Sequence, residues 1–279
     1  MIDKRDALTI FHDSNSTFSD YSHKMAVFGR DGVTLNISSS LDYIYIGFHK
    51  PINSFYVNIS TVDGAEGSLN LEYYNGSNWN EVSNKSDDTL GFYRSGFVRW
   101  DRELQNNAKT SVDDSTKYWY RVKLDQDRTG MVIEGLNIVF SDDYELSLEQ
   151  PYISDQEFLG SESSHIKTHS AVKREIIQRF RNKNYIKYNH STGEKEDINA
   201  WDLLDIDEVR LASTYLALSK IYYQLSDNPD DVWASKSAMY ENKFNKYVDL
   251  ATLSVDVDDD GLISPSENKP AFTNRYMRR

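Results

Sequence analysis

An acidic segment of the sequence combines residue types and spacings that could bind a metal ion. Residues 256–267 contain aspartates at the first, third and fifth positions, a glycine at the sixth and a glutamate at the twelfth. Three carboxylates two residues apart can surround one side of a hard cation, and the distant glutamate can close the other side with two oxygens. This spacing predicts a Ca²⁺ site. Its expected ligands are Asp256, Asp258, Asp260, Leu262 through its carbonyl, Ser264 and Glu267.

The order of these positions is that of an EF-hand loop, in which the glycine allows the sharp turn. A helix over 230–250 would lead into the loop. Pro270 leaves about one turn for a helix after it, because proline disfavours helix in the preceding residue. The sequence has no second loop to pair with this one. We therefore expect a lone, calmodulin-like or dockerin-like loop in which calcium is structural; the alternative is an acidic turn without metal.

Two amphipathic helices are predicted to position this loop. The first starts after residues 205–208, where an aspartate is followed three residues later by a glutamate, as in a capping box. The short connection 226–229 makes the two helices antiparallel neighbours. Apolar residues repeat in steps of three and four on each helix. They are Leu211, Tyr215, Leu218, Tyr222 and Leu225 on the first, and Trp233, Tyr240, Phe244 and Tyr247 or Val248 on the second.

The first half of the chain has a period of two, which is typical of strands. The Asn75-Gly76 pair between two such runs predicts a hairpin with a type I′ turn, because both central residues of that turn need positive φ. Residues 106–116 are expected to be a loop. The predicted strands are 33–37, 43–46, 55–59, 69–74, 96–100, 117–124 and 131–140.

The change of period predicts an α+β, multidomain protein. Residues 1–150 are expected to form an antiparallel β-sandwich or jelly roll, in which residues 1–24 are an arm or a first edge strand. A polar linker follows over 151–164. An α-helical adaptor domain then covers 165–279 and contains the calcium-type loop 256–267 and the tail 268–279.

Composition excludes several classes of protein. The 279 residues include no cysteine, so disulfides and thiol catalysis are absent. A net charge of −13 argues against general nucleic-acid binding, because phosphates would be repelled. No apolar run approaches the roughly 20 residues that span a bilayer. The first residues lack the apolar core of a signal peptide, so we expect synthesis in the cytoplasm and no membrane partner.

Other candidate sites have simpler interpretations. His165 and His169, four residues apart, could share a helix face as metal ligands do, but solvated residues at a helix start are the favoured interpretation. The aromatic residues of the first half could stack on sugars, although core packing is favoured. The acidic pairs 87–88 and 113–114 are expected to be solvated. These aromatic residues are Tyr73, Tyr74, Trp79, Trp100, Tyr118, Trp119 and Tyr120.

The tail 268–279 is basic and aromatic in an otherwise acidic chain. It carries four cationic side chains and no acid, which suggests a peptide that docks on an acidic or apolar surface of a partner. The alternative is a frayed terminus. The expected partner-binding residues are Phe272, Arg275, Tyr276, Arg278 and Arg279.

These features together resemble a known family. Residues 166–279 combine a basic first helix, the segment Trp201-Asp-Leu-Leu-Asp-Ile-Asp-Glu208, an aromatic helix pair and a tail ending in arginines. This layout resembles the head-to-tail connector (adaptor) proteins of tailed bacteriophages. The segments 71–79, 95–100 and 118–122 look like a β-sandwich module common in phage virion proteins.

The resemblance implies a structural virion protein without catalysis. It would form a homo-oligomeric ring, commonly a dodecamer, that joins the portal protein to tail and neck proteins, with DNA passing through the ring. The C-terminal tail would insert into the portal. The sandwich and the calcium loop depart from the smallest adaptors, which are mostly helical, so the sandwich would decorate the ring or contact tail or fibre components.

Two other functions remain open. One is a carbohydrate-binding module on a tail or baseplate protein, using the sandwich aromatics. The other is a glycan-processing enzyme with a dockerin-like tail. The enzyme is disfavoured because no paired acids are placed beside an apolar wall, and the sequence has no nucleophile elbow, P-loop or dinucleotide fingerprint.

The calcium prediction can be tested by stability. Calcium should raise the melting temperature of the helical part of the chain, because a ligand that binds only the folded state stabilises it. Glu267→Gln should largely remove this response, since it weakens the two-oxygen closure. Identical melting curves in calcium and in chelator, at one protein concentration, would refute the site.

Overall fold

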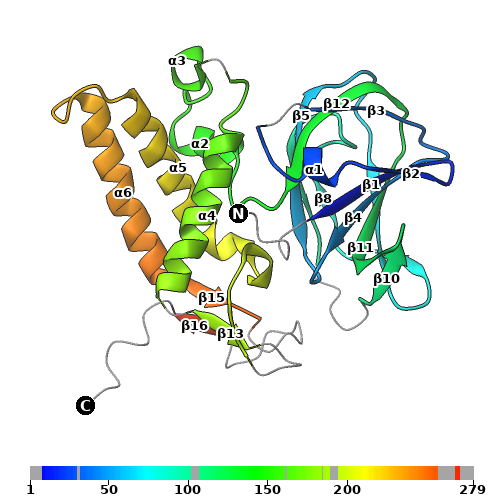
Figure 1. The fold of residues 1–279 in the computed structure, drawn as a ribbon. Coiled ribbons are helices and arrows are strands. Elements are labelled where there is room, and N and C mark those ends of the chain that lie inside the picture. Colours follow the sequence, from blue (N-terminus) through cyan, green and yellow to red (C-terminus); the bar gives the residue numbers. More distant parts are fainter. Residues whose placement is uncertain are drawn as a thin grey trace. The chain divides into compact units, whose positions relative to one another are not determined.

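The structure is a computed structural model that describes residues 8–29, 32–101, 107–160, 162–183, 185–188, 194–256 and 268–270. The chain divides into two compact units, Met1–Ile138 and Val139–Arg279. The first unit is rich in strands and the second contains the long helices, and the sheets are antiparallel (Figure 1). This mixed α/β organisation confirms the coarse prediction. No helix in the described part of the chain is long and apolar enough to cross a membrane.

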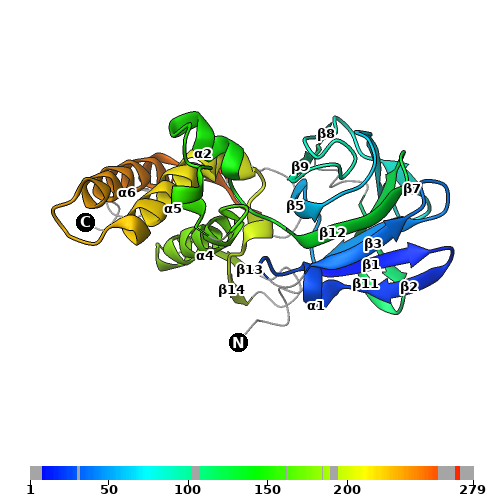
Figure 2. The same cartoon turned by 90° about the horizontal axis from the view of Figure 1, so that it is seen from above.

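The first unit contains two antiparallel sheets and a short helix, α1 (Ser22–Met25) (Figure 2). The larger sheet has the order β2-β1-β4-β11-β6-β7, with β10 also paired to β11, and the smaller has the order β3-β12-β5-β9-β8. The larger sheet consists of β1 (Thr9–Ser14), β2 (Thr17–Asp20), β4 (Tyr43–Phe48), β6 (Leu69–Tyr74), β7 (Trp79–Glu81), β10 (Lys109–Val112) and β11 (Ser115–Leu124). The smaller consists of β3 (Val33–Ile37), β5 (Ser54–Thr61), β8 (Ser86–Asp87), β9 (Gly96–Arg99) and β12 (Arg128–Asn137).

Aromatic side chains connect the two sheets. The Tyr120 ring of β11 lies 5.0 Å from Trp100, which follows β9, and Trp100 lies 5.7 Å from Phe55 of β5. The Tyr120 hydroxyl donates to the carbonyl of Ile52 at 2.8 Å and accepts from its N–H at 3.0 Å. The buried phenol therefore has both its hydrogen-bonding needs met, as a buried polar group requires. These contacts explain why the period-two aromatics of the sequence are core residues.

The turns of this unit differ from the prediction. Asn75-Gly76 belongs to a four-residue loop in which Gly76 has φ +97°. The Asn75 side-chain oxygen accepts from the backbone N–H groups of Ser77 and Asn78. Two-residue turns with both φ values positive occur instead at Asn15–Ser16, at 50° and 69°, between β1 and β2, and at Asp113–Asp114, at 44° and 63°, between β10 and β11. The prediction of a loop over 106–116 was therefore wrong, because β10 extends the sheet there.

The second unit contains three long helices that pack side by side (Figure 1). The basic first helix and the two predicted amphipathic helices are confirmed as α4, α5 and α6. The helices are α2 (Asp143–Glu149), α3 (Gln156–Leu159), α4 (Ile166–Asn182), α5 (Arg210–Leu225) and α6 (Val232–Leu250), with 3-10 turns η2 (Ala200–Asp202) and η3 (Ile206–Val209). The short strands are β13 (Ile186–Tyr188) with β14 (Lys195–Asp197), and β15 (Thr252–Ser254) with β16 (Asn268–Pro270).

A stack of aromatic rings fills the contact between α5 and α6. Tyr222 lies between Trp233, at 5.6 Å and 11°, and Tyr240, at 5.8 Å and 9°. Tyr240 also stacks on Tyr215 at 6.1 Å and 23°. Near-parallel rings at these separations attract one another in addition to the area they bury. The predicted aromatic faces of the two helices therefore meet each other directly.

Residues at the end of α2 form hydrogen bonds with the hydroxyls of this stack. Gln150 accepts from the Tyr222 hydroxyl at 2.7 Å and donates to the Tyr240 hydroxyl at 2.8 Å. Glu149 accepts from the Tyr215 hydroxyl at 3.2 Å. Since buried hydroxyls without partners would destabilise the fold, α2 is a necessary part of the helical unit.

The predicted linker over 151–164 and the domain end at residue 150 are not what the structure shows. The two units divide between Ile138 and Val139, and the segment after that point folds with the helices. Leu146 and Ile153 are buried, and α3 lies within the predicted linker. The acids at 142, 143 and 145 form hydrogen bonds inside the second unit, whereas most of residues 151–164 are exposed although they fold with it.

Two fragments distinguish these boundaries. A fragment 139–279 should unfold cooperatively, whereas a fragment 151–279 should be destabilised by several kcal/mol or fail to fold, because it exposes the aromatic stack and removes its hydrogen-bond partners. Urea unfolding followed by circular dichroism measures both. Equal stabilities would show that residues 139–150 are a linker after all.

Candidate functional site

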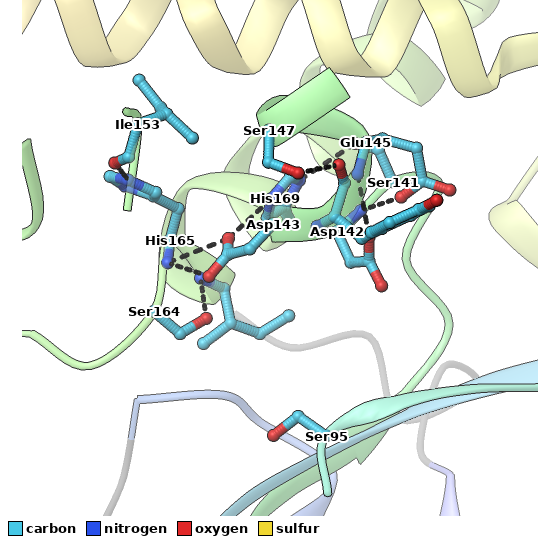
Figure 3. A network of polar contacts seen from close by, with 12 residues as sticks. Ser95, Ser141, Asp142, Asp143, Glu145, Ser147, Ile153, Ser164, His165 and His169 are labelled. Carbon is cyan, nitrogen blue, oxygen red and sulfur yellow. Dashed lines mark hydrogen bonds and ion pairs between the residues drawn. The ribbon is translucent and has the colours of Figure 1, made fainter. Parts of the chain in front are cut away.

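A polar network joins the first residues of α2 to α4 and α5 (Figure 3). The Ser141 hydroxyl oxygen lies 2.9 Å from Nδ1 of His169 and 2.7 Å from the hydroxyl of Ser213. Nε2 of His169 lies 3.2 Å from Oδ1 of Asp143. A hydroxyl, an imidazole and a carboxylate are thus connected in series.

Local structure fixes each of these groups. Asp142 caps α2 by accepting from the N–H groups of Tyr144 and Glu145, and Glu145 accepts from the Asp142 N–H. This capping box places its neighbours Ser141 and Asp143 on either side of the helix start. His165, at the start of α4, donates its backbone N–H to both carboxylate oxygens of Asp143, at 3.2 and 3.1 Å.

The order of groups is that of a nucleophile with its base and an orienting acid. Such chemistry requires that a substrate reach the hydroxyl. Ser141 and His169 are fully buried, and the Ser141 hydroxyl is also bonded to Ser213. In this arrangement the network holds three helices together, and its connectivity alone does not make it a catalytic site.

The two acids at the start of α2 titrate in opposite directions. Burial by itself raises the pKa of Asp143, but the hydrogen bond and charge of His169, with His165 and Ser164, outweigh it and lower this pKa overall. Burial, followed by the hydrogen bond and charge of Glu145, raises the pKa of Asp142 to about 8. The Asp142–Glu145 pair therefore shares a proton near neutral pH, while Asp143 stays ionised.

The interpretation of His165 and His169 as solvated residues was wrong. Both are buried, and Nε2 of His165 donates to the carbonyl of Ile153 at 2.9 Å. Each ring thus connects α4 to the segment that precedes it. Among the described residues, no group of three or more acids and histidines is arranged to hold a metal ion.

Of the predicted calcium ligands, only Asp256 belongs to the described residues. Its neighbourhood differs from an EF-hand, because β15 separates α6 from the loop and β16 follows it. The two strands pair from Ser254 with Asn268 to Thr252 with Pro270. The predicted helix over 230–250 is confirmed as α6, but it does not lead directly into the loop, and residues 268–270, at the end of the expected exiting turn, form β16. The predicted ligands outside the described residues are Asp258, Asp260, Leu262, Ser264 and Glu267.

The start of this loop is firmly attached. Asp256 is buried and donates its N–H to the carbonyl of Asp202 at 3.0 Å, and Ser254 donates its N–H and hydroxyl to Glu208 at 2.7 and 2.8 Å. Burial raises the pKa of Glu208, and the bonds from Ser254 partly offset this. Glu208 does not complete the predicted capping box, because β15 occupies its carboxylate.

The predicted tail contacts all lie outside the described residues: Phe272, Arg275, Tyr276, Arg278 and Arg279. The aromatic group of the first unit divides in two. Tyr73, Trp100, Trp119 and Tyr120 are buried, as core packing predicts, whereas Tyr74, Trp79 and Tyr118 are half-buried.

Sequence analysis missed the polar network because its acids lie in residues that were assigned to the end of the sandwich domain. A signal was present: Asp142 followed three residues later by Glu145 and then by Leu146 is a capping-box pattern before an apolar residue. It predicts a helix start there. The pairing of Asp143 with His169 is a tertiary contact that no local pattern indicates.

Comparison with known proteins adds no assignment. No protein-family model matches the chain, and no curated protein matches its sequence.

The raised pKa of Asp142 predicts a pH-dependent stability. A folded-state pKa above the unfolded value of about 4 gives a contribution to stability that is complete below pH 4 and is lost as pH rises towards 8. Asp142→Asn keeps a capping oxygen and mimics the protonated acid. We therefore compare the effect of this substitution on the free energy of unfolding at two pH values. The effect should be more stabilising at pH 8 than at pH 5 by about 1–2 kcal/mol.

Urea unfolding of the full chain between pH 5 and 8 measures this difference. Asp155→Asn is the matched control, because Asp155 precedes α3 without a side-chain capping bond. Wild-type and Asp142→Asn curves that run parallel over this range would show that Asp142 is ionised throughout.

Proposed function

We propose that this chain is a structural virion protein of a tailed bacteriophage, a head-to-tail connector that assembles into a ring between portal and tail. The observation that carries the proposal is exposed apolar surface on the helical unit. Tyr144, Leu148 and Tyr152, on and after α2, are 67%, 66% and 74% exposed. Tyr144 and Leu148 are four residues apart and share a helix face. Large apolar side chains gathered on one short segment are typical of a surface that packs against another protein.

The long helices carry further exposed apolar side chains. Leu211, which the sequence pattern placed in the buried face of α5, is exposed instead. The aromatic stack makes α5 and α6 a rigid pair, so these residues are presented on a fixed surface. Other exposed members of the pair are Tyr223, Val232, Met239 and Leu250. Such a body suits lateral packing between identical copies, in which one surface meets another.

The finer fold assignment belongs to the same proposal. The first unit is a β-sandwich or jelly roll, supported by two antiparallel sheets connected through Tyr120, Trp100 and Phe55. The second is an adaptor domain, supported by its three packed helices. The sandwich would lie on the ring as decoration or contact tail and fibre components.

The calcium loop and the tail complete the proposal. The hairpin of β15 and β16 brings Asn268 opposite Ser254, so the two ends of the acidic loop are held together. Buried Asp256 would be one ligand from the fixed side of the loop. The tail beyond Pro270 would carry Phe272 and Tyr276 into apolar pockets of the portal and pair its arginines with carboxylates at the rim.

Separate variants test assembly and docking. Leu148→Lys with Tyr152→Lys should abolish the ring in analytical ultracentrifugation, because charge is placed in an apolar contact.

A chain ending at Lys269 should keep the ring and lose co-sedimentation with the portal. Within the tail, Phe272→Ala with Tyr276→Ala should weaken portal binding far more than Lys269→Ala, because buried aromatic anchors typically contribute about 2 kcal/mol or more each.

A wild-type chain that stays monomeric, alone and with portal and tail proteins, would contradict the proposal. Undiminished portal binding by the chain ending at Lys269 would contradict the role of the tail alone. Gln224→Lys, at an exposed polar residue of α5, is a control for nonspecific effects of added charge.

A further inference from the structure

One face of the larger sheet carries aromatic and charged side chains in place of an ordinary solvated surface. Successive residues of a strand point to opposite faces. Tyr120 points towards the contact with Trp100, so its neighbours Trp119 and Arg121 point to the other face. The pairing register places Phe11, Tyr45, Arg121 and Glu72 in one row across β1, β4, β11 and β6.

A small hydrophobic cluster forms the base of this face. Trp119 is fully buried and stacks on Phe11 at 5.4 Å and 25°. Gly47 lies beneath the indole, where a Cβ would be 2.7 Å from a ring carbon, so only glycine allows this depth. Tyr45 and Val112 complete the buried cluster. The base is therefore rigid and cannot rearrange around a ligand.

Three half-buried aromatic rings, Phe18, Tyr43 and Trp79, surround this base. The Arg121 guanidinium lies between two of them, 4.6 Å from the Tyr43 ring and 4.6 Å from the Trp79 ring. Glu72 accepts from Arg121 at 2.6 Å. A second cation, Nζ of Lys123, lies 5.5 Å from the Tyr43 ring. Two cations and the two carboxylates Glu72 and Asp13 therefore balance on this face.

A buried acceptor on this face lacks a donor. Oδ1 of Asp13 is shielded from solvent and has no hydrogen-bond partner among the described residues. Asp13 is paired with Tyr43 on one side and with Phe18 on the other. Asp13 as a whole is half-buried, so part of the residue between the two aromatic residues remains accessible, and its carboxylate could accept from a ligand hydroxyl there.

From this arrangement we infer that the face formed by Asp13, Phe18, Tyr43, Trp79 and Arg121 is a binding site for neutral carbohydrate. A pyranose ring has an apolar C–H face that stacks on aromatic rings, and hydroxyls that donate to a carboxylate and accept from cationic side chains. Glu72 and Asp13 balance the charges of Arg121 and Lys123, so the face has no net positive charge to attract phosphates or nucleic acids. The site goes beyond the proposed connector function and would add glycan recognition to the first unit.

This site differs from the aromatic group that the sequence suggested. Of that group only Trp79 belongs to it, since Trp119 lies in its buried base and Trp100 and Tyr120 connect the two sheets. Phe18 and Tyr43 come from strands that are distant in sequence from Trp79, and the sheet order brings them together.

The test uses the full chain and a panel of neutral oligosaccharides: trimers of glucose, mannose, galactose and N-acetylglucosamine. Saturation-transfer NMR identifies a binder, and isothermal titration gives its Kd. Asp13→Ala and Trp79→Ala should each weaken binding at least tenfold. Tyr223→Ala, an exposed aromatic of the second unit, is the matched control and should leave the Kd unchanged. Asp13→Asn keeps the shape of the site and removes its charge, so a fivefold or larger loss is expected even if Trp79→Ala is unstable.

Three outcomes would overturn the inference. They are no binding of any neutral trimer, binding that Asp13→Asn and Trp79→Ala leave unchanged, and binding of inorganic phosphate or a sulfated polysaccharide in place of neutral sugars. Self-association that Tyr43→Ala abolishes would also overturn it, because the face would then be an interface between copies. Because these measurements do not depend on the ring, failure of the connector proposal and failure of this site are distinguishable.

Discussion

The second unit depends on burying tyrosine rings while every buried hydroxyl keeps a hydrogen-bond partner. Tyr222 and Tyr240 lie inside the α5–α6 contact, where stacking favours the rings but each hydroxyl still needs a partner. Gln150 supplies both partners with one side chain, as acceptor for the first hydroxyl and donor to the second. Because Gln150 follows α2, the aromatic contact fixes α2, and through the capping box it also fixes the buried network of Ser141, Asp143 and His169.

That dependence explains why a serine, a histidine and an aspartate in series belong to the architecture of the protein. Their hydrogen bonds join α2, α4 and α5, and the serine and the histidine are fully buried. Asp143 stays ionised because His169 offsets the cost of burial, whereas Asp142 shares a proton with Glu145. The same residue type thus adopts two charge states one position apart, according to its partner.

The two units present different kinds of surface. The helical unit exposes aliphatic and aromatic side chains such as Leu148 and Tyr152, which suits contact with protein and underlies the connector proposal. The sheet face around Asp13 alternates rings with charged groups and has an unsatisfied acceptor, which suits a ligand with both C–H and hydroxyl faces. In a connector, such a division would let the helices assemble while the sheets recognise a second partner.

The sequence by itself determined the classes and positions of most elements, because periods of two and of three to four residues report directly which side of the backbone is buried. It placed β3 and β6 at their observed ends and gave the aromatic faces of α5 and α6. Only the tertiary structure decided which polar residues are solvated. His169, Asp143 and Glu208 have polar sequence neighbours, and the partners that they bond are distant in sequence. It also decided that strands flank residues 256–267 and that Phe18, Tyr43 and Trp79 share one face. Each of these depends on strand order and helix packing, which bring together residues that no local pattern relates.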